Sequence, residues 1–302
     1  MKFAKLLHNP EAGEGDYSKK ELISLIQSAG FGCSYSSTKK KGWEKIEAKE
    51  TDFIILAGGD GTVRRIAAHL LDKRLLDKKL PIALLPLGTA NNIAKTLGIL
   101  GSTPEEVIRQ WTETNIKKFD VGRIYGLDEA EFFLESFGFG VFPELMNRMS
   151  KRDEDDGTPQ DSIKTAWEVI KEILTKAQAK YCKIKIDGVE HKGNYLMVEI
   201  MNTTTIGPKL HLAPLADPAD GTFDVVMISE KQRDQFIQYV ESLMVGKEEV
   251  AFFDLLRAKK LEISWDGTKA HVDDQVIRLE KNTPIEIELR HGLLEFFAPD
   301  KG

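Results

Sequence analysis

An apolar segment that runs directly into a glycine-rich turn constrains this chain more than any other feature. Residues 53–57 read FIILA, a helical apolar pattern begins near residue 63, and the turn between them consists of Gly58, Gly59, Asp60, Gly61, Thr62, Val63 and Arg64. Glycines let backbone N–H groups approach phosphate oxygens, and the positive end of the following helix dipole favours negative charge. An aspartate in such a turn indicates a magnesium ion beside the phosphates. We therefore predict a nucleotide site near residue 60.

A second glycine turn has the same layout. The apolar residues 82–85 run into Pro86, Gly88 and Thr89, and a helical pattern follows Asn91 and Asn92. Either turn alone is also typical of an ordinary strand-to-helix connection in α/β proteins. Two such turns in one short region favour a nucleotide site. Neither matches the P-loop or the dinucleotide-binding fingerprint, so those two motifs lose their main support.

These turns belong to four segments that resemble the diacylglycerol kinase catalytic-domain family, which includes bacterial lipid kinases and the sphingosine and ceramide kinases. The four segments are residues 9–13 (NPEAG), residues 58–62, residues 85–92, and Ala213-Pro214 followed by Asp220-Gly221. Their order and spacing carry the resemblance, which spans nearly the whole chain. The Gly-Gly-Asp-Gly loop by itself is shared with NAD kinases and phosphofructokinases.

The resemblance implies that ATP is the nucleotide and that Asp60 organises its magnesium ion. The ATP-binding residues implied in this way are Asn9, Pro10, Gly13, Thr38, Gly58, Gly59, Asp60, Gly61, Thr62, Val63, Arg64, Gly88, Thr89 and Asn91. The alternative role for Asp60 is structural, because an aspartate can fix a turn through hydrogen bonds to backbone groups. The family usually has Asn-Asp where this chain has Asn91-Asn92. A carboxylate is therefore missing at the helix start, and we expect a modest change in metal or nucleotide affinity.

The resemblance also implies that Asp273 is the catalytic base. The family places its base in an Asp-Gly-Glu turn near the carboxyl terminus, and this chain has Asp273-Asp274-Gln275 there. Replacing the glycine restricts φ in the turn, and the second carboxylate becomes a neutral amide. Asp266-Gly267 is a competing candidate. We predict instead that it forms a two-residue hairpin turn between strands at residues 261–265 and 269–272, which would make Asp266 structural.

A magnesium-binding loop is implied by the same resemblance at residues 217–222. The side chain of Asp220 and the backbone carbonyls of Asp217 and Thr222 would supply part of an oxygen shell that water completes. The alternative is an ordinary β-turn that leads into a strand. None of the six histidines has metal-ligand spacing, and His271 draws attention only because it precedes Asp273 by two residues.

A change of pattern near residue 122 predicts two domains. Residues 1–122 alternate strands and helices, which is typical of a parallel sheet flanked by helices. By resemblance this is an ATP-binding α/β domain like that of NAD kinases, to which residues 292–302 return. Residues 123–291 consist mainly of strand patterns, one of them at residues 132–139, which predict a mainly antiparallel β-sandwich that would hold the acceptor. One of its two amphipathic helices follows the cap candidates Asp161 and Ser162, and the other stops at Gly246.

Composition narrows the class of protein further. The chain has 302 residues, 41% of them hydrophobic, which is enough for a sizeable core. Its net charge of −6 argues against nucleic acid as a partner. No apolar run approaches the roughly 20 residues that cross a bilayer, and the first residues are too weakly apolar for a signal peptide. We therefore predict a cytoplasmic protein that touches a membrane only peripherally, at its inner face. Cys33 and Cys182 are interpreted as ordinary thiols.

Two basic clusters and one charged loop are candidates for lipid contact. The clusters are Lys39, Lys40 and Lys41, and then Lys73, Arg74, Lys78 and Lys79. Each charge near an anionic surface contributes about 1 kcal/mol, although solvated helix ends explain the clusters equally well. The charged run at residues 151–157 is interpreted as a solvated loop, with a flap over the lipid entrance as the alternative.

We therefore predict an ATP- and Mg²⁺-dependent kinase that phosphorylates a hydroxyl of a lipid substrate such as diacylglycerol. Two alternatives stay open. One is a kinase of a soluble acceptor such as NAD, built on the same glycine loop. The other is a catalytically inactive nucleotide or lipid sensor, which the altered Asp-Gly-Glu turn suggests. The identity of the lipid and the oligomeric state, a homodimer included, also stay open.

Overall fold

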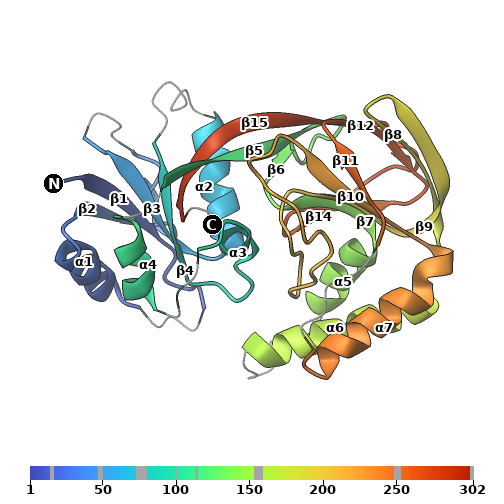
Figure 1. The fold of residues 1–302 in the computed structure, drawn as a ribbon, viewed down its shortest axis with the longest axis horizontal. Coiled ribbons are helices and arrows are strands. Elements are labelled where there is room, and N and C mark those ends of the chain that lie inside the picture. Colours follow the sequence, from blue (N-terminus) through green and yellow to red (C-terminus); the bar gives the residue numbers. More distant parts are fainter. Residues whose placement is uncertain are drawn as a thin grey trace. The chain divides into compact units, whose positions relative to one another are not determined.

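A computed structural model describes residues 1–13, 17–46, 50–72, 80–99, 101, 103–112, 115–152, 159–247 and 253–299. The chain forms two compact units (Figure 1): unit 1 comprises Met1–Phe119 and His291–Gly302, and unit 2 comprises Asp120–Arg290. Strands β5 (Asn115–Tyr125) and β15 (Ile285–Ala298) continue from one unit into the other and pair with each other. Within the described part of the chain, no helix is long and apolar enough to span a membrane.

Unit 1 is built on a parallel sheet in the order β15-β4-β3-β1-β2. Its strands from the first part of the chain are β1 (Phe3–His8), β2 (Gly32–Ser37), β3 (Phe53–Gly58) and β4 (Ile82–Pro86). Strand β3 is buried along its whole length, as expected for a central strand that is covered on both faces. The end of β15 joins this sheet where Phe296 lies opposite Ile82 of β4.

Helices cover both faces of this sheet (Figure 1). Helices α1 (Lys19–Ser28) and α4 (Pro104–Gln110) pack together on one face, and α2 (Asp60–Asp72) lies on the other. The short helix α3 (Asn92–Thr96) follows β4. Ser18 and Glu21 form a capping box at the start of α1, and Gly30 follows its end with a φ of 86°. Gly30 therefore ends this helix.

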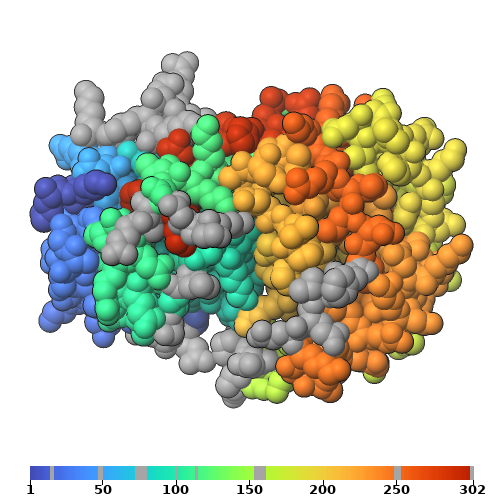
Figure 2. Space-filling view, viewed as in Figure 1, coloured from blue at the N-terminus to red at the C-terminus, as the bar shows by residue number. Residues whose placement is uncertain are grey.

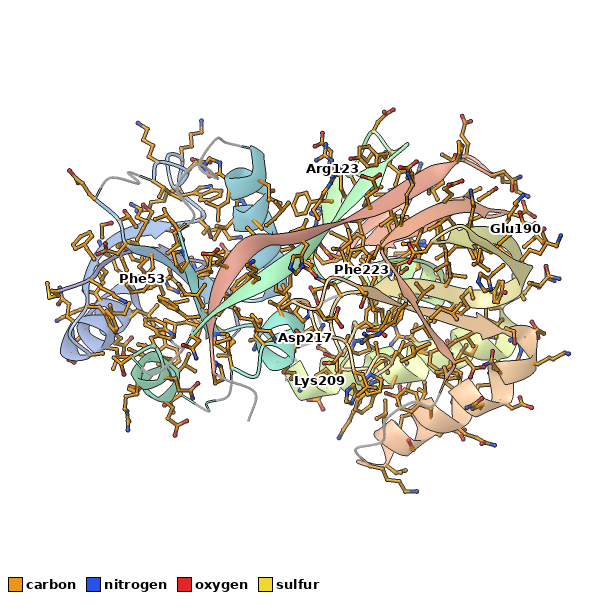
Figure 3. All side chains as sticks on the ribbon, turned by 45° about the horizontal axis from the view of Figure 1, so that its top comes forward. Phe53, Arg123, Glu190, Lys209, Asp217 and Phe223 are labelled. Atoms are coloured by element: carbon orange, nitrogen blue, oxygen red, sulfur yellow. The ribbon has the colours of Figure 1, made fainter. Side chains whose placement is uncertain are left out.

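The core of unit 1 joins the first strands to the last residues of the chain. The ring of Phe53 on β3 lies 5.3–6.2 Å from the rings of Phe31, Trp111 and Phe297 (Figure 3). Phe296 packs against Phe119 at 5.1 Å between ring centroids. The aromatic residues of β15 are therefore part of the core of unit 1.

Unit 2 contains a mainly antiparallel set of strands. The path of paired strands is β14 (Gln275–Arg278), β13 (Lys269–Val272), β7 (Ser136–Gly140), β9 (Val189–Met201), β8 (Lys180–Ile186), β12 (Lys260–Trp265) and β15. Strand β10 (Phe223–Ser229) pairs with β9 and with β11 (Leu255–Ala258), and β6 (Phe132–Phe133) pairs with β5. Asp187 and Gly188 turn the β8–β9 hairpin with φ of 45° and 92°, as an Asp-Gly hairpin requires.

Two apolar clusters hold unit 2 together. One lies among the strands and contains Phe137, Phe139 and Phe223. The other lies under the helices α5 (Val141–Met149), α6 (Pro159–Lys176) and α7 (Arg233–Met244), which gather on one side of the strands (Figure 1). The apolar faces of α6 and α7 therefore form part of the core. Because α6 begins at Pro159, Asp161 and Ser162 lie inside its first turn and are not its caps, which corrects that prediction.

Two further predictions about strands were wrong. Residues 132–139 do not form one strand: β6 ends at Phe133, and β7 begins at Ser136. Asp266-Gly267 does not turn a hairpin between β12 and β13, because β12 pairs with β8 and β15, whereas β13 pairs with β7 and β14. Asp266 instead lies on the surface and forms an ion pair with Lys281 at 3.2 Å.

Candidate active site

The loops that follow β1, β2, β3 and β4 meet at one edge of the unit 1 sheet. These are the carboxyl ends of parallel strands, where open α/β sheets bind their ligands. The Asn9 N–H donates to the carbonyl of Ala57 at 2.9 Å, and the Thr38 N–H donates to that of His8 at 2.9 Å. The Leu87 N–H donates to the carbonyl of Gly58 at 3.1 Å. The structure therefore brings the predicted ATP-binding segments of unit 1 together, and we call this edge the nucleotide cradle.

Glycines allow the loops of the cradle to touch. A Cβ atom on Gly88 would lie 2.5 Å from the Cα of Gly59, and one on Gly13 would lie 2.6 Å from the carbonyl oxygen of Leu87. Gly13 also has a φ of 64°, which an L side chain rarely adopts. These neighbours are backbone atoms that cannot move aside. The glycines are thus required for packing of loop against loop, a role that the sequence analysis did not assign to them.

Asp60 caps the helix that follows the second glycine turn. Its carboxylate accepts the N–H of Asn92 at 2.8 Å and that of Ile93 at 3.1 Å. A carboxylate at a helix start is favoured by the orphan N–H groups there. Asp60 therefore has the structural role that was considered as the alternative. Its hydrogen bonds fix the second glycine turn and not the turn in which Asp60 itself lies. Its carboxylate also supplies negative charge at the helix start, where Asn92 replaces the aspartate usual in the family.

Asn91 closes the second glycine turn from inside. It has a left-handed backbone with φ 52°, its Oδ1 accepts the Gly88 N–H at 3.0 Å, and its Nδ2 donates to the Gly88 carbonyl at 2.6 Å. Thr62 Oγ1 accepts a hydrogen bond from Asn9 Nδ2 at 3.2 Å, which ties the first loop to α2. Several side chains that were predicted to bind ATP therefore hold the cradle itself in shape.

The remaining predicted residues of the cradle differ in exposure. Pro10, Gly61 and Thr89 are exposed, Arg64 is half-buried, and Val63 is buried in the core. Thr38 is buried and its hydroxyl donates to the His8 carbonyl at 3.4 Å. Val63 and Thr38 therefore contribute backbone and packing, whereas the exposed residues are accessible to a ligand.

Asp273 lies in unit 2, in the turn of the β13–β14 hairpin. Val272 pairs with Gln275, so Asp273 and Asp274 form the two-residue turn. Asp273 has a φ of 51°, whereas Asp274 is not among the described residues with a positive φ. The position where the family has glycine therefore does not require a glycine conformation here. The unusual backbone belongs to the aspartate itself.

The carboxylate of Asp273 is held by three backbone N–H groups. Oδ1 accepts from Leu134 at 3.1 Å, Glu135 at 2.8 Å and Ser136 at 3.2 Å, and Oδ2 shares the Leu134 N–H at 3.1 Å. These donors lie where the chain leaves β6 and enters β7. The side chain is buried, with 8% of the residue exposed. Backbone donors of this kind stabilise a carboxylate in its charged form.

A buried ionisable pair next to Asp273 was missed by the sequence analysis. Nε2 of His271 lies 2.9 Å from Oε2 of Glu199, and Nδ1 of His271 lies 3.0 Å from the carbonyl oxygen of Asp273. Burial raises the pKa of Glu199, and His271 partly offsets this. Burial alone would lower the pKa of His271, but Glu199 and Asp273 raise it above its usual value. The available signal was a charged residue, Glu199, inside the apolar run at residues 196–201.

The predicted magnesium loop in unit 2 forms a tight turn at the start of β10. Oδ1 of Asp220 accepts the N–H and the hydroxyl of Thr222 at 2.9 and 2.8 Å, and its Oδ2 pairs with Arg257 at 3.1 Å. Oδ1 of Asp217 accepts the Ala219 N–H at 3.1 Å. Figure 3 places Asp217 in the loop before β10, and in Figure 2 part of the gold segment that contains this loop is visible at the surface of unit 2.

A buried aspartate that the sequence analysis did not identify supports this loop. Asp120 is fully buried, its Oδ2 accepts the Gly221 N–H at 2.9 Å, and its N–H donates to the Pro218 carbonyl at 2.6 Å. Among the described residues, no three His, Cys, Asp or Glu side chains gather as metal ligands. The predicted magnesium site consists of one carboxylate, two backbone carbonyls and water, so the lack of such a side-chain cluster does not test it. Magnesium at Asp217, Asp220 and Thr222 stays a prediction.

The candidate lipid-contact residues are only partly described. Lys39 is exposed and forms an ion pair with Glu11, and Lys40 and Lys41 are exposed. Lys73, Arg74, Lys78, Lys79 and residues 153–157 of the charged loop lie outside the described residues.

Two family models match the chain. The model described as "Diacylglycerol kinase catalytic domain" matches residues 4–124, and the model described as "YegS C-terminal NAD kinase beta sandwich-like domain" matches residues 148–296. The chain therefore contains a diacylglycerol kinase catalytic domain. It is a lipid kinase, and therefore a phosphotransferase, and its family implies the use of ATP.

Two relatives agree with this family. A diacylglycerol kinase of Bacillus subtilis (strain 168) is 27% identical over 289 residues, which are 88% of this chain and 90% of the relative. A diacylglycerol kinase of Mycobacterium tuberculosis (strain ATCC 25618 / H37Rv) is 25% identical and covers 84% of this chain and 79% of its own.

Two solved structures have a similar fold. A diacylglycerol kinase of Bacillus anthracis str. Sterne has a TM-score of 0.72 at 23% identity, with 98% of this chain and 96% of that chain covered. An NAD kinase of Archaeoglobus fulgidus in complex with ATP has a TM-score of 0.54 at 15% identity, with 100% and 95% covered. The predicted fold class, an NAD kinase-like α/β unit with a β-sandwich unit, is confirmed.

Proposed function

We propose that this lipid kinase depends on ATP and Mg²⁺ and transfers the γ-phosphoryl group to a hydroxyl of a lipid such as diacylglycerol. The observation that carries the proposal is the convergence of four loops at one edge of the unit 1 sheet, in the family identified above. The Bacillus and Mycobacterium relatives, which are diacylglycerol kinases, support this acceptor class. The NAD kinase of similar fold that was solved with ATP supports the nucleotide.

The cradle has the properties that phosphate binding requires. Helix α2 starts at the glycine turn, so the N–H groups of its first turn favour an anion at that end. Gly61 is exposed at this position. When bound, Mg²⁺ would neutralise the charge that develops on the phosphates. We expect Asp60 to act chiefly by holding the second glycine turn, because its carboxylate already accepts two backbone N–H bonds.

We assign Asp273 as the group that orients the acceptor hydroxyl and receives its proton. Oδ1 already accepts three N–H bonds, so Oδ2 is the oxygen that we assign to this role. The backbone donors favour the charged form of the carboxylate and fix its direction. A weakly basic carboxylate is adequate, because positioning contributes most of the catalysis of phosphoryl transfer.

One observation favours a sensor as a second candidate. The same three N–H bonds that fix Asp273 also reduce its basicity, and a carboxylate used only as a structural anchor would look the same. A sensor would bind ATP at the cradle without transferring phosphate. Measurement of ATP binding and phosphate transfer on the same sample separates the two functions.

The acceptor lies in a membrane, so we propose peripheral contact of this protein with the inner membrane face. The exposed Lys39, Lys40 and Lys41 support the proposal, because lysines near an anionic surface each contribute about 1 kcal/mol. A sedimentation assay with vesicles that contain or lack anionic lipid tests it.

The experiment for the function is transfer of labelled γ-phosphate from ATP to a panel of lipids and to NAD, with Mg²⁺. We expect labelled lipid from the native protein, and a loss of at least about a hundredfold in Asp273→Asn. Asp266→Asn is the matched control, because Asp266 is an exposed aspartate of the same unit. Transfer to NAD alone would contradict the lipid acceptor. Transfer to lipid that survives in Asp273→Asn would show that another group is the base.

A further inference from the structure

Glu199 and His271 face each other across a glycine on the strand between them. In the sheet of unit 2, Gly138 of β7 lies opposite Glu199 of β9 on one side and opposite His271 of β13 on the other. Strands two places apart are separated by almost 10 Å, so the two side chains meet only by reaching over the middle strand. A Cβ atom on Gly138 would lie 2.2 Å from the Glu199 carboxylate. The lack of a side chain at Gly138 therefore allows Glu199 and His271 to meet over the middle strand.

The pair is fully buried, which is unfavourable unless every polar atom is paired. His271 is 1% exposed and Glu199 is 0% exposed. Replacement of a buried ion pair by apolar side chains is often neutral or stabilising. Stability alone therefore does not account for a glutamate and a histidine in this core.

The hydrogen bonds of His271 define its proton positions. Nδ1 lies 3.0 Å from the carbonyl oxygen of Asp273, which can only accept, so Nδ1 must carry a hydrogen. Nε2 then shares a single proton with Glu199, either as imidazolium with carboxylate or as imidazole with carboxylic acid. Both forms satisfy the contact at Nε2. The pair therefore keeps the Nδ1 hydrogen directed at Asp273.

Phe142 and Glu144 of the neighbouring helix α5 do not take part in these hydrogen bonds. The ring of Phe142 from α5 lies 5.8 Å from the imidazole. The ionisable residue Glu144 of α5 is engaged with Arg148 at 2.9 Å and with Lys269 at 3.5 Å. The ring nitrogens of His271 bond to the carboxylate of Glu199 and to the backbone carbonyl of Asp273.

Asp273 needs such an anchor because of its backbone. A φ of 51° is uncommon for a residue other than glycine. Its N–H donates to the Ser136 carbonyl at 2.9 Å, its carboxylate accepts three N–H groups, and its carbonyl accepts from His271. Strained backbone of this kind persists only where its surroundings fix it from several sides. His271 provides the bond to the carbonyl.

We infer that Glu199 and His271 are positioning residues, which hold the Asp273 turn so that its carboxylate faces the acceptor hydroxyl. The role in catalysis rests on the proposed function of Asp273. The pair touches neither substrate nor phosphate in this scheme; it acts through the carbonyl of Asp273. A pair that only filled the core would be replaceable by apolar side chains without loss of activity.

The test is the double variant Glu199→Met/His271→Phe, which keeps the approximate shape of both side chains and leaves no buried charge unpaired. We expect it to fold and to bind ATP as the native protein does, because the cradle belongs to unit 1. Its kcat should fall about ten- to a hundredfold, the usual effect of losing a supporting residue behind a functional group, with the KM for ATP unchanged. Hydrogen exchange of the Leu134, Glu135 and Ser136 amides should become faster. Glu199→Gln, which keeps a partner for Nε2, should retain most of the activity.

A matched control is Lys183→Met/Glu190→Met, which removes an exposed ion pair of 2.8 Å from the same unit. It should change neither kcat nor exchange at residues 134–136. If the folded Glu199→Met/His271→Phe variant kept both native kcat and native exchange, the inference would be overturned. If the native protein phosphorylated no lipid, the proposed function would fail, and the exchange rates would still decide whether the pair positions Asp273.

A measurement on the native protein avoids any dependence on the folding of a variant. In protein labelled with ¹⁵N-histidine, Nδ1 of His271 should show the signal of a protonated nitrogen, slow to exchange with water. An Nδ1 without hydrogen would break the bond to the Asp273 carbonyl and overturn the inference.

Discussion

Replacement of Asp60 separates a structural role from a role in nucleotide binding. Its carboxylate accepts two N–H groups from Asn92 and Ile93, which are 3% and 1% exposed. A helix cap is worth about 1 kcal/mol, and a bond to a charged group about 1.5–3 kcal/mol. We therefore expect Asp60→Ala to lower the free energy of unfolding of unit 1 by about 2–4 kcal/mol. Asp60→Asn keeps one acceptor oxygen and should lose about half as much.

The assay is urea unfolding without ATP, followed by hydrogen exchange of peptides from unit 1. Asp52→Ala is the matched control, because its carboxylate accepts a single exposed N–H, that of Phe3 at 2.7 Å. That variant should lose less than about 1 kcal/mol. If Asp60→Ala had native stability in the absence of ATP and only its ATP binding were lost, the capping argument would be refuted. Asp60 would then act on the nucleotide alone.

Three further predictions concern single positions. Gly88→Ala should abolish ATP binding, measured by calorimetry, because its Cβ would lie 2.5 Å from the Gly59 backbone; Gly193→Ala, whose near neighbour is the flexible end of Tyr195, should bind normally. Burial raises the pKa of Asp224 to about 6. The folded state therefore binds a proton that the unfolded state releases from about pH 4 upward, so the free energy of unfolding should fall by about 3 kcal/mol between pH 4 and 7. In urea unfolding with EDTA present, Asp224→Asn should remove this decrease in the free energy of unfolding. An unchanged pH dependence in the variant would contradict the assignment of the raised pKa to Asp224. Asp274→Gly should lower the free energy of unfolding by about 0.5–1 kcal/mol, since no positive φ is relieved there; a gain in stability would contradict the backbone assignment.

The local pattern of residues was sufficient to predict strands β3 and β4 of the unit 1 sheet, but β2 was not predicted. The run at residues 53–57 corresponds to the buried β3, and the glycine turn leads into α2 as expected. Convergence of the loops was implied by the family resemblance, and it agrees with the rule that the carboxyl ends of parallel strands share one edge. Capping of α3 by Asp60 did not follow, because the bond joins residues 32 and 33 positions apart. Sequence periodicity carries no information about such a distant partner.

The predictions for unit 2 failed where distant segments meet. The break between β6 and β7 was not predicted, because residues 132–139 are rich in aromatic residues and resemble a single strand. The break exists because the N–H groups of residues 134–136 turn to a carboxylate more than 130 positions later in the chain. The prediction of an Asp266-Gly267 hairpin was wrong for a related reason. The flanking strands pair with distant strands of the sheet, β12 with β8 and β13 with β7.

The passage of β5 and β15 between the units affects the order of folding. Seen from unit 1, residues 120–290 are one long loop, and closing a flexible loop of that length costs about 4–5 kcal/mol of chain entropy. Pairing of β5 with β15 holds the two ends of that loop together once unit 2 has folded. Phe296, which completes the sheet of unit 1 beside β4, is synthesised after all of unit 2. On the ribosome, the nucleotide-binding unit would therefore start first and finish last, and a folding defect anywhere in the insertion would delay its closure.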